Sequence, residues 1–90
     1  MIDPSKIQIG DLLKTKTNIF VFDPKQFNKK QIPSYKGKWV PRKIITVLDK
    51  KIDNNREDYC KFSFLIMADG VVYTIYLDPN VGNAAKLERL

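Results

Sequence analysis

Two residues, Asp69-Gly70, separate two runs rich in β-branched and aromatic side chains, and they constrain the fold more than any other feature. The run before them covers residues 59–67, and the run after them covers residues 71–77. Asp-Gly between two such runs is the strongest short-range signal for a β-hairpin, because both central positions of the tight turn need a positive φ. The sequence therefore predicts two antiparallel strands joined at this dipeptide.

Alternation along the two runs predicts which side chains face the core, because successive side chains of a strand point to opposite faces. The outward set includes Val72, Thr74 and Tyr76 in the second run. Together with Leu65, Val72 and Tyr76 would offer an apolar outer face through which copies of the chain could assemble. The predicted inward set is Phe62, Phe64, Ile66, Val71, Tyr73, Ile75 and Leu77.

The rest of the chain also indicates extended structure. Residues 7–22 alternate and then become β-branched and aromatic, with an interruption at Gly10-Asp11 that indicates a bulge or a corner. Residues 15–18 are either a bend in one long strand or a turn between two short ones. A further strand is predicted at 43–48, followed by a polar turn over 49–58. The last ten residues form either one helical turn or a short strand near 86–90.

A long loop separates the first extended run from the strand at 43–48. Asp23-Pro24 ends the extended run, since proline lacks the donor that a central strand needs and aspartate favours turns. The segment 23–41 then contains Pro33, Gly37 and Pro41 as further interruptions. A loop of this length in a small domain is usually functional.

The order of these elements resembles the SH3-like small β-barrel, a group that includes SH3, Tudor and KOW-type domains. The segments that carry the resemblance are "IQIGDLL", "PRKIITVL", "FSFLIMADGVVYTIYLDP" and "AKLERL". The resemblance implies an all-β fold, with residues 1–90 forming a single barrel of about five antiparallel strands and a long basic first loop. The acidic loop and "ALYDY"-like run of peptide-binding SH3 domains are absent, as is the KOW-type glycine pattern. The resemblance therefore implies a fold and no particular function.

The positive charge of the chain is concentrated in this loop. The formal net charge is +6, and the segment from Asp23 to Lys43 alone contains seven cations and one anion. The other nine cations and nine anions cancel. A cluster of this kind exceeds what solubility requires and indicates an anionic partner.

Aromatic side chains are interleaved with these cations. Single-stranded nucleic acid is held by cations that contact phosphates and by aromatic faces on which bases stack. Phe27 also lies in the segment, and the sequence leaves open whether Phe27 and Trp39 face the partner or the core. The predicted binding residues are Lys25, Lys29, Lys30, Tyr35, Lys36, Lys38, Trp39, Arg42 and Lys43.

Catalysis and metal binding are not expected. The chain has no histidine, so neither a Ser-His nor a Cys-His pair can form. Cys60 is the single cysteine and is predicted to fill apolar space in a strand, and one cysteine without histidine excludes a zinc site. The carboxylates near Asp49 and Asp53 alternate with cations, unlike a magnesium or calcium site. We therefore expect a protein that is not an enzyme and has no cofactor.

Two classes of partner remain. The first is DNA or RNA, bound with little sequence preference because lysine contacts to phosphate carry no base information. The second is an acidic surface of a larger protein, which would make the chain a protein-interaction module. Thirteen lysines against three arginines suit a low-GC genome, such as that of a phage or bacterium.

The sequence also predicts a cellular location. One cysteine, no apolar signal region and no run long enough to span a bilayer indicate a cytoplasmic protein without membrane contact, in the host cytoplasm if a phage encodes it. The oligomeric state is not indicated.

Overall fold

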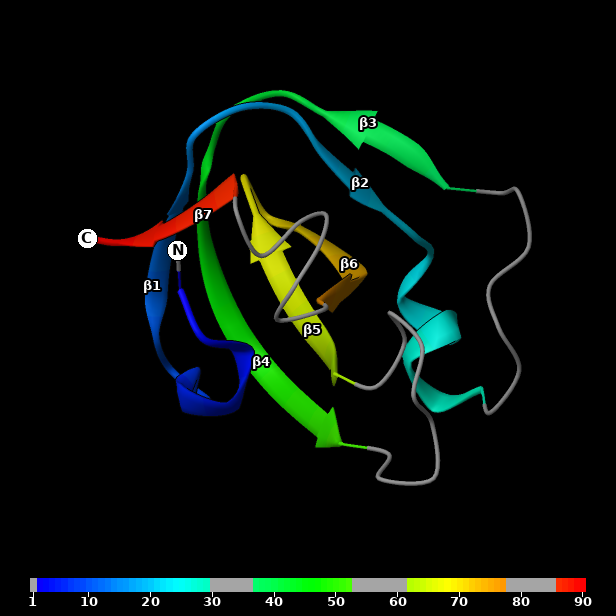
Figure 1. Cartoon of the computed structure of the whole chain (residues 1–90). Coiled ribbons are helices and arrows are strands. Elements are labelled where there is room, and N and C mark those ends of the chain that lie inside the picture. Colours follow the sequence, from blue (N-terminus) through cyan, green and yellow to red (C-terminus); the bar gives the residue numbers. More distant parts are fainter. Residues whose placement is uncertain (1, 30–36, 53–61, 78–85) are drawn as a thin grey trace.

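The computed structural model describes residues 2–29, 37–52, 62–77 and 86–90, and its regular structure in these ranges is β-strand with two short 3-10 helices (Figure 1). The all-β class is therefore confirmed. The helices are η1 (Pro4–Lys6) and η2 (Pro24–Asn28). The strands are β1 (Leu12–Thr15), β2 (Ile19–Val21), β3 (Lys38–Val40), β4 (Ile44–Ile52), β5 (Phe62–Ala68), β6 (Val71–Leu77) and β7 (Leu87–Arg89).

Five of these strands form one antiparallel sheet, in the order β6-β5-β4-β1-β7, which we call the main sheet. The other two strands, β2 and β3, pair with each other in a small sheet. The predicted number of about five antiparallel strands is confirmed by the main sheet, although this sheet does not close into a barrel. The C-terminal residues form strand β7, so the strand was the correct alternative for this segment.

The predicted hairpin at Asp69-Gly70 is present. Asp69 has a φ of 52° and Gly70 a φ of 77°, so both central residues adopt the positive φ that the tight turn requires. The pairing continues from Ala68 with Val71 to Phe62 with Leu77. The two strands thus pair over their whole described length.

The two sheets are halves of one bent antiparallel ribbon. β1 pairs with β4, and further along the same two segments β2 pairs with β3. The bend lies at Thr15, whose hydroxyl accepts a hydrogen bond from the Lys43 amide at 2.7 Å while its own amide donates to the Lys43 carbonyl at 2.9 Å. Residues 16–18 therefore connect two short strands of different sheets, rather than forming a bend inside one strand.

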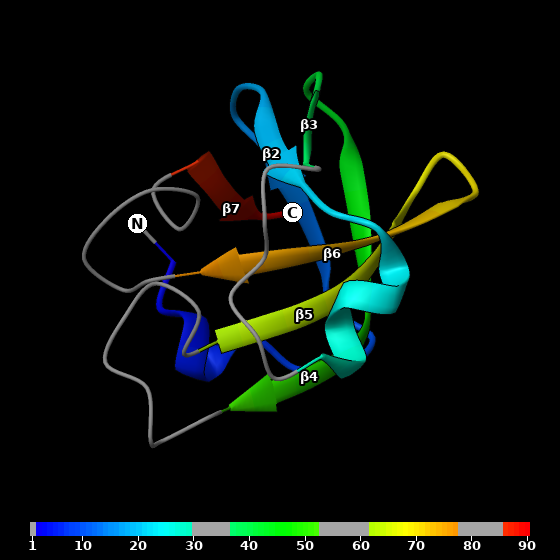
Figure 2. The same cartoon turned by 90° about the vertical axis from the view of Figure 1, so that its right-hand side faces the viewer.

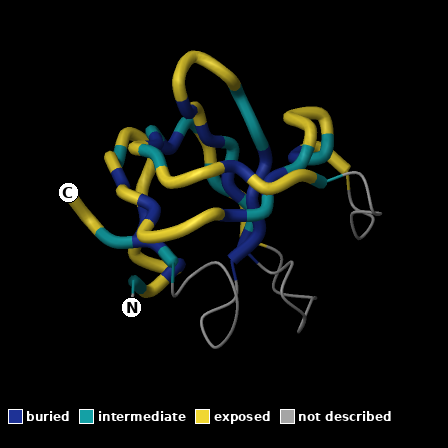
Figure 3. The backbone as a smooth tube through the Cα atoms, turned by 90° about the horizontal axis from the view of Figure 1, so that it is seen from above, coloured by how far each residue is buried: buried dark blue, intermediate teal, exposed yellow. Residues whose placement is uncertain are grey.

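The core lies between the two sheets. Figure 3 shows buried positions alternating with exposed ones along several strands. The predicted inward side chains of β5, namely Phe62, Phe64 and Ile66, are all buried. Gly10 has a φ of 92° in the turn before β1, and its amide donates to the Val47 carbonyl, so the structural interpretation of this glycine is supported. The buried side chains from the other strands include Leu13, Ile19, Val21, Val40, Ile45, Val47, Ile75, Leu77 and Leu87.

The predicted faces of β6 are partly wrong. Thr74 and Tyr76 were expected to point outward but are buried, whereas Val71 was expected inward and is exposed. The reason is that η2, which Figure 2 shows in front of the main sheet, packs against β6, while the residue after β2 pairs with β6 along its edge. Phe22 forms an isolated bridge with Thr74, and the Thr74 hydroxyl donates to the Asp23 carbonyl at 2.9 Å. Tyr76 therefore does not contribute to an exposed apolar face.

The predicted loop over 23–41 contains regular structure. Pro24–Asn28 forms η2, which Asp23 caps by accepting a hydrogen bond from the Lys25 amide at 2.8 Å. Lys38–Val40 forms β3 against β2. The sequence did not predict β3, because the strand is short and is flanked by Gly37 and Pro41.

The strand predicted at 43–48 is longer than expected. β4 continues to Ile52 because residues 49–52, assigned to a polar turn, pair with β5 beyond an irregularity between Val47 and Asp49. The remaining turn residues 53–58 and the strand start at 59–61 with Cys60 lie outside the described residues. Among the described residues, no helix is long and apolar enough to cross a membrane.

Candidate nucleic-acid interface

Trp39 is the most prominent aromatic side chain on the surface. It lies in β3 opposite Phe20 of β2, and 58% of its surface is exposed. The two ring centroids are 5.1 Å apart and the ring planes meet at 63°, so the two rings pack edge-to-face. Trp39 therefore faces solvent rather than the core, with part of its aromatic surface exposed.

The support beneath Trp39 continues inward as a row of aromatic rings. Phe20 contacts Phe22 with centroids 5.1 Å apart, and Phe22 contacts Tyr76 with centroids 5.4 Å apart. Gly37 lies against the first two rings, and a Cβ there would lie 2.6 Å from Phe20 Cζ and 2.9 Å from Phe22 Cε1. The absence of a side chain at Gly37 therefore permits the packing that positions Trp39.

Lys86 places a cation directly over Trp39. Its Nζ lies 4.6 Å from the centre of the Trp39 ring. The Lys86 carbonyl accepts a hydrogen bond from the Lys16 amide at 2.6 Å, which holds the start of β7 beside the end of β1. Residues from three segments thus form one surface, which we call the Trp39 surface: Phe20, Trp39 and Lys86.

Lys38 precedes Trp39 in β3 and points to the opposite face of the strand. Its Nζ lies 5.2 Å from the centre of the Tyr73 ring in β6. The predicted residues Lys38 and Trp39 are therefore adjacent in sequence, but their side chains lie on opposite faces of the small sheet.

The other predicted site residues are more scattered. Lys25 and Lys29 are exposed in η2 and at its end, and Arg42 is exposed after β3. Lys43 is half-buried and forms an ion pair with Asp69, which neutralises its charge locally. Lys30, Tyr35 and Lys36 lie outside the described residues.

Phe27 is a core residue, with only 4% of its surface exposed. It lies in η2, which packs against β5 and β6, and Lys51 Nζ lies 4.8 Å from its ring centre. The same ammonium group donates to the Phe27 carbonyl at 3.1 Å. Phe27 therefore anchors η2 and is not available for stacking.

The sequence did not identify Phe20, Tyr73 or Lys86 as members of a site. Phe20 belongs to a run that indicated only a strand, and Tyr73 was expected to point inward. Lys86 lies 47 positions after Trp39, and only the pairing of β7 with β1 brings the two together. A pattern of local sequence contains no signal for this juxtaposition.

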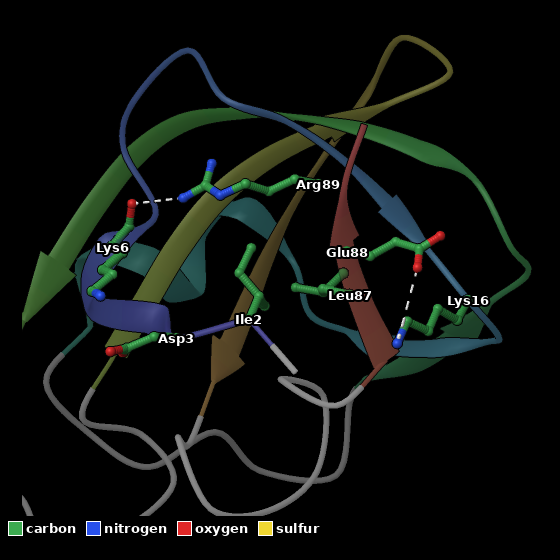
Figure 4. A pocket seen from close by; sticks show the side chains of 7 residues that line it. All are labelled: Ile2, Asp3, Lys6, Lys16, Leu87, Glu88 and Arg89. Atoms are coloured by element: carbon green, nitrogen blue, oxygen red, sulfur yellow. Dashed lines mark hydrogen bonds and ion pairs between the residues drawn. The ribbon is translucent and has the colours of Figure 1, made fainter.

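A hollow of about 490 Å³ lies between the N-terminal segment and β7 (Figure 4). Three of its charged side chains, Lys16, Glu88 and Arg89, are already paired. Arg89 donates to the Lys6 carbonyl and to Asp11, each at 2.9 Å, and Lys16 lies 4.0 Å from Glu88. A hydrogen bond from Lys14 lowers the pKa of Glu88, which therefore stays ionised at neutral pH. This hollow is poorly suited to a polyanion because it contains carboxylates.

Metal ligands do not cluster in the described ranges, where no group of three or more histidine, cysteine, aspartate or glutamate side chains lies together. No family model, curated protein or solved structure matches the chain.

Proposed function

We propose that the protein is a non-catalytic nucleic-acid-binding domain that holds a single strand on the Trp39 surface with little sequence preference. The observation that carries this proposal is the exposed indole of Trp39, packed edge-to-face with Phe20 and flanked by the Lys86 ammonium group. Side chains of this kind provide what single-strand binding needs, a stacking face beside a cation.

In the proposed mechanism, the aromatic rings contact bases and the cations contact phosphates. A base stacks on the exposed part of the indole, while Lys86 contacts a neighbouring phosphate. Arg42, Lys25 and Lys29 supply further positive charge around the small sheet. Because lysine meets phosphate as a point charge, such contacts favour any sequence.

We further propose that the fold is an open variant of the SH3-like small barrel. The chain order β1, β4, β5, β6 and β7, with a long insertion after β1, agrees with the order that the resemblance implied. Phe20 and Trp39 lie on this insertion, where the small sheet presents them.

The test is a titration of fluorescently labelled single- and double-stranded DNA and RNA oligonucleotides, at several salt concentrations, with Trp39 emission recorded in parallel. Trp39 is the only tryptophan, so its emission reports on this surface alone. For three to five phosphate contacts, log affinity falls with log salt at a slope of about −2 to −4.5. Quenching of Trp39 is expected to accompany single-strand binding.

Two results would contradict the proposal. Binding that does not depend on salt would exclude phosphate contacts, and an absence of binding at low salt would exclude the function. Binding with unchanged Trp39 emission would mean that the cations contact the oligonucleotide and that the indole does not.

A second candidate is the protein-interaction module, favoured by a different surface. Leu12, Thr46, Met67 and Val72 face one another across four strands of the main sheet, and Leu12 and Met67 are exposed. Exposed apolar side chains in a row are typical of interfaces with protein partners. Capture from cell extract tests this: a stoichiometric protein that survives nuclease treatment with wild type, and is lost with Leu12→Lys, supports it. Equal capture by both proteins would contradict it.

A further inference from the structure

A second hollow lies between the end of β2 and the start of β6, on the Lys38 side of the small sheet. Its volume is about 330 Å³, at the lower end of the range for small-ligand sites. The walls are largely apolar, and Phe22, Pro24, Val71, Val72 and Tyr73 contribute to them. We call it the Tyr73 cavity.

The charged groups of this cavity suggest its occupant. Lys38 lines the cavity with its ammonium group over the Tyr73 ring, and it has no acidic partner among the described residues. Asp23 also lines the cavity. The Oδ1 atom of its carboxylate accepts from the Lys25 amide at 2.8 Å, and the Oδ2 atom has no partner in the described part of the chain. The residues that line the cavity therefore include an aromatic ring, a cation and a carboxylate with one oxygen that no described residue contacts.

We propose that the Tyr73 cavity binds one nucleobase that has an exocyclic amino group, namely cytosine, adenine or guanine, from the same strand that stacks on Trp39. The base packs on the Tyr73 ring, Lys38 moves from the ring to the adjoining phosphate, and Asp23 accepts a hydrogen bond from the amino group. Carboxylates accept from the cytosine amino group in this way. Thymine and uracil have no exocyclic amino group, and their single N3–H donor lies between two carbonyl oxygens that repel a carboxylate. This inference rests on the proposed function and adds a base preference to it.

The position of β3 makes one strand on both sites feasible. β3 is an edge of the small sheet, and consecutive side chains in it point to opposite faces. Lys38 and Trp39 therefore stand on either side of one strand that, in the described part of the chain, pairs only with β2. A strand that crosses this edge places one base on Trp39 and a neighbouring base in the Tyr73 cavity.

The experiment compares labelled oligocytidine and oligothymidine of eight nucleotides by fluorescence anisotropy, with Trp39 emission recorded in parallel. Wild type is expected to bind oligocytidine about 2- to 10-fold more tightly, the equivalent of one net hydrogen bond. Asp23→Asn presents an amide donor that favours the thymine carbonyl, so the preference is expected to disappear or reverse. Asparagine is as good a helix cap as aspartate, so η2 is retained.

Three further variants complete the test. Tyr73→Leu removes the ring and is expected to weaken oligocytidine binding about 5- to 150-fold, the value of one stacked base, while Trp39 is still quenched. Lys38→Gln is expected to weaken both oligonucleotides alike, because phosphate contacts carry no base information. Lys6→Gln is the matched control, since Lys6 is an exposed cation in η1 outside the cavity.

The outcomes separate this inference from the proposed function. If no oligonucleotide binds wild type, both fail. If binding quenches Trp39 but shows no base preference, and Asp23→Asn and Lys38→Gln behave as wild type, the cavity proposal fails and the proposed function stands. These two variants decide the matter even if Tyr73→Leu does not fold. A preference that persists in Asp23→Asn also overturns the assignment of Asp23.

Discussion

Gly37 is the residue on which the packing beneath Trp39 depends most directly. A methyl group there would overlap the Phe20 ring and lie 2.9 Å from Phe22 Cε1. Phe20 cannot move freely, because it also contacts Trp39 with ring centroids 5.1 Å apart. Gly37→Ala is therefore expected to displace both rings and to lower the free energy of unfolding by about 1–3 kcal/mol, as overpacking does. Denaturant unfolding and the emission maximum of Trp39 measure the two effects.

Gly10→Ala is the control for this prediction. Gly10 has a φ of 92°, and a Cβ there meets nothing within 4 Å, so the substitution adds backbone strain without a steric clash. It is expected to destabilise by roughly 1–2 kcal/mol while leaving Trp39 emission unchanged. An unchanged emission maximum in Gly37→Ala would contradict the described packing.

The hydrogen bonds of Asp11 indicate how the stability of the fold changes with pH. Hydrogen bonds from the Gln8 amide at 2.8 Å and from Arg89 at 2.9 Å lower the pKa of its carboxyl below the usual 3.8. A carboxyl whose folded pKa is lowered contributes stability above its unfolded pKa and loses that contribution as pH falls through the folded value. Unfolding by denaturant between pH 5 and pH 2 is expected to show less loss of stability with acid in Asp11→Asn than in wild type. Identical slopes would exclude this contribution.

At the scale of the elements, the bent ribbon depends on Thr15. Its buried hydroxyl accepts from the Lys43 amide at 2.7 Å and donates to the Lys43 carbonyl at 3.1 Å, at the point where the chain leaves the main sheet. Thr15→Val keeps the shape of the side chain but leaves the Lys43 amide without its acceptor. We expect a loss of about 1–3 kcal/mol and faster hydrogen exchange at that amide.

Thr17→Val is the matched control for Thr15→Val. Thr17 is exposed between the two strands, and substitution there is expected to stay within about 0.5 kcal/mol of wild type. Unchanged exchange at the Lys43 amide in Thr15→Val would show that the ribbon bends for another reason.

The elements also show how far local sequence determines the fold. The hairpin at Asp69-Gly70 and the inward face of β5 were predictable, because turn chemistry and a period of two are local signals. The burial of Thr74 on the outer face of β6 was not predictable, because it arises from β2 and η2, which lie 50 positions earlier. β3 was missed because three residues between Gly37 and Pro41 give no periodic pattern.

At the scale of the whole molecule, the sequence showed where the excess positive charge lies but did not predict the Trp39 surface. Trp39 and Lys38 were predicted as neighbours in one site, and the structure places them on opposite sides of an edge strand. Lys86 reaches Trp39 only because β7, which begins at the next residue, pairs with β1. Such a site depends on contacts between distant segments, which composition and spacing do not encode.

Charge placement, rather than net charge, is then expected to govern binding. Lys86→Gln and Lys6→Gln each remove one positive charge from a formal net charge of +6. Lys86 lies over Trp39, whereas Lys6 lies in η1, which Figure 1 shows at the lower left, away from β2 and β3 at the top. Each phosphate contact with a single strand releases condensed counterions and contributes about 0.7 to the slope of log affinity against log salt. If Lys86 contacts a phosphate, its loss therefore reduces the magnitude of this slope by about 0.7.

Lys6→Gln is expected to keep the wild-type slope within error, because its charge acts only through the long-range field and is screened beyond about 10 Å at 0.1 M salt. The measurement is the affinity for one single-stranded oligonucleotide at five or more salt concentrations for the three proteins. Equal reductions in both variants would mean that the oligonucleotide responds to net charge and that the Trp39 surface is not its site. A reduced slope in Lys86→Gln alone would place a phosphate beside the indole.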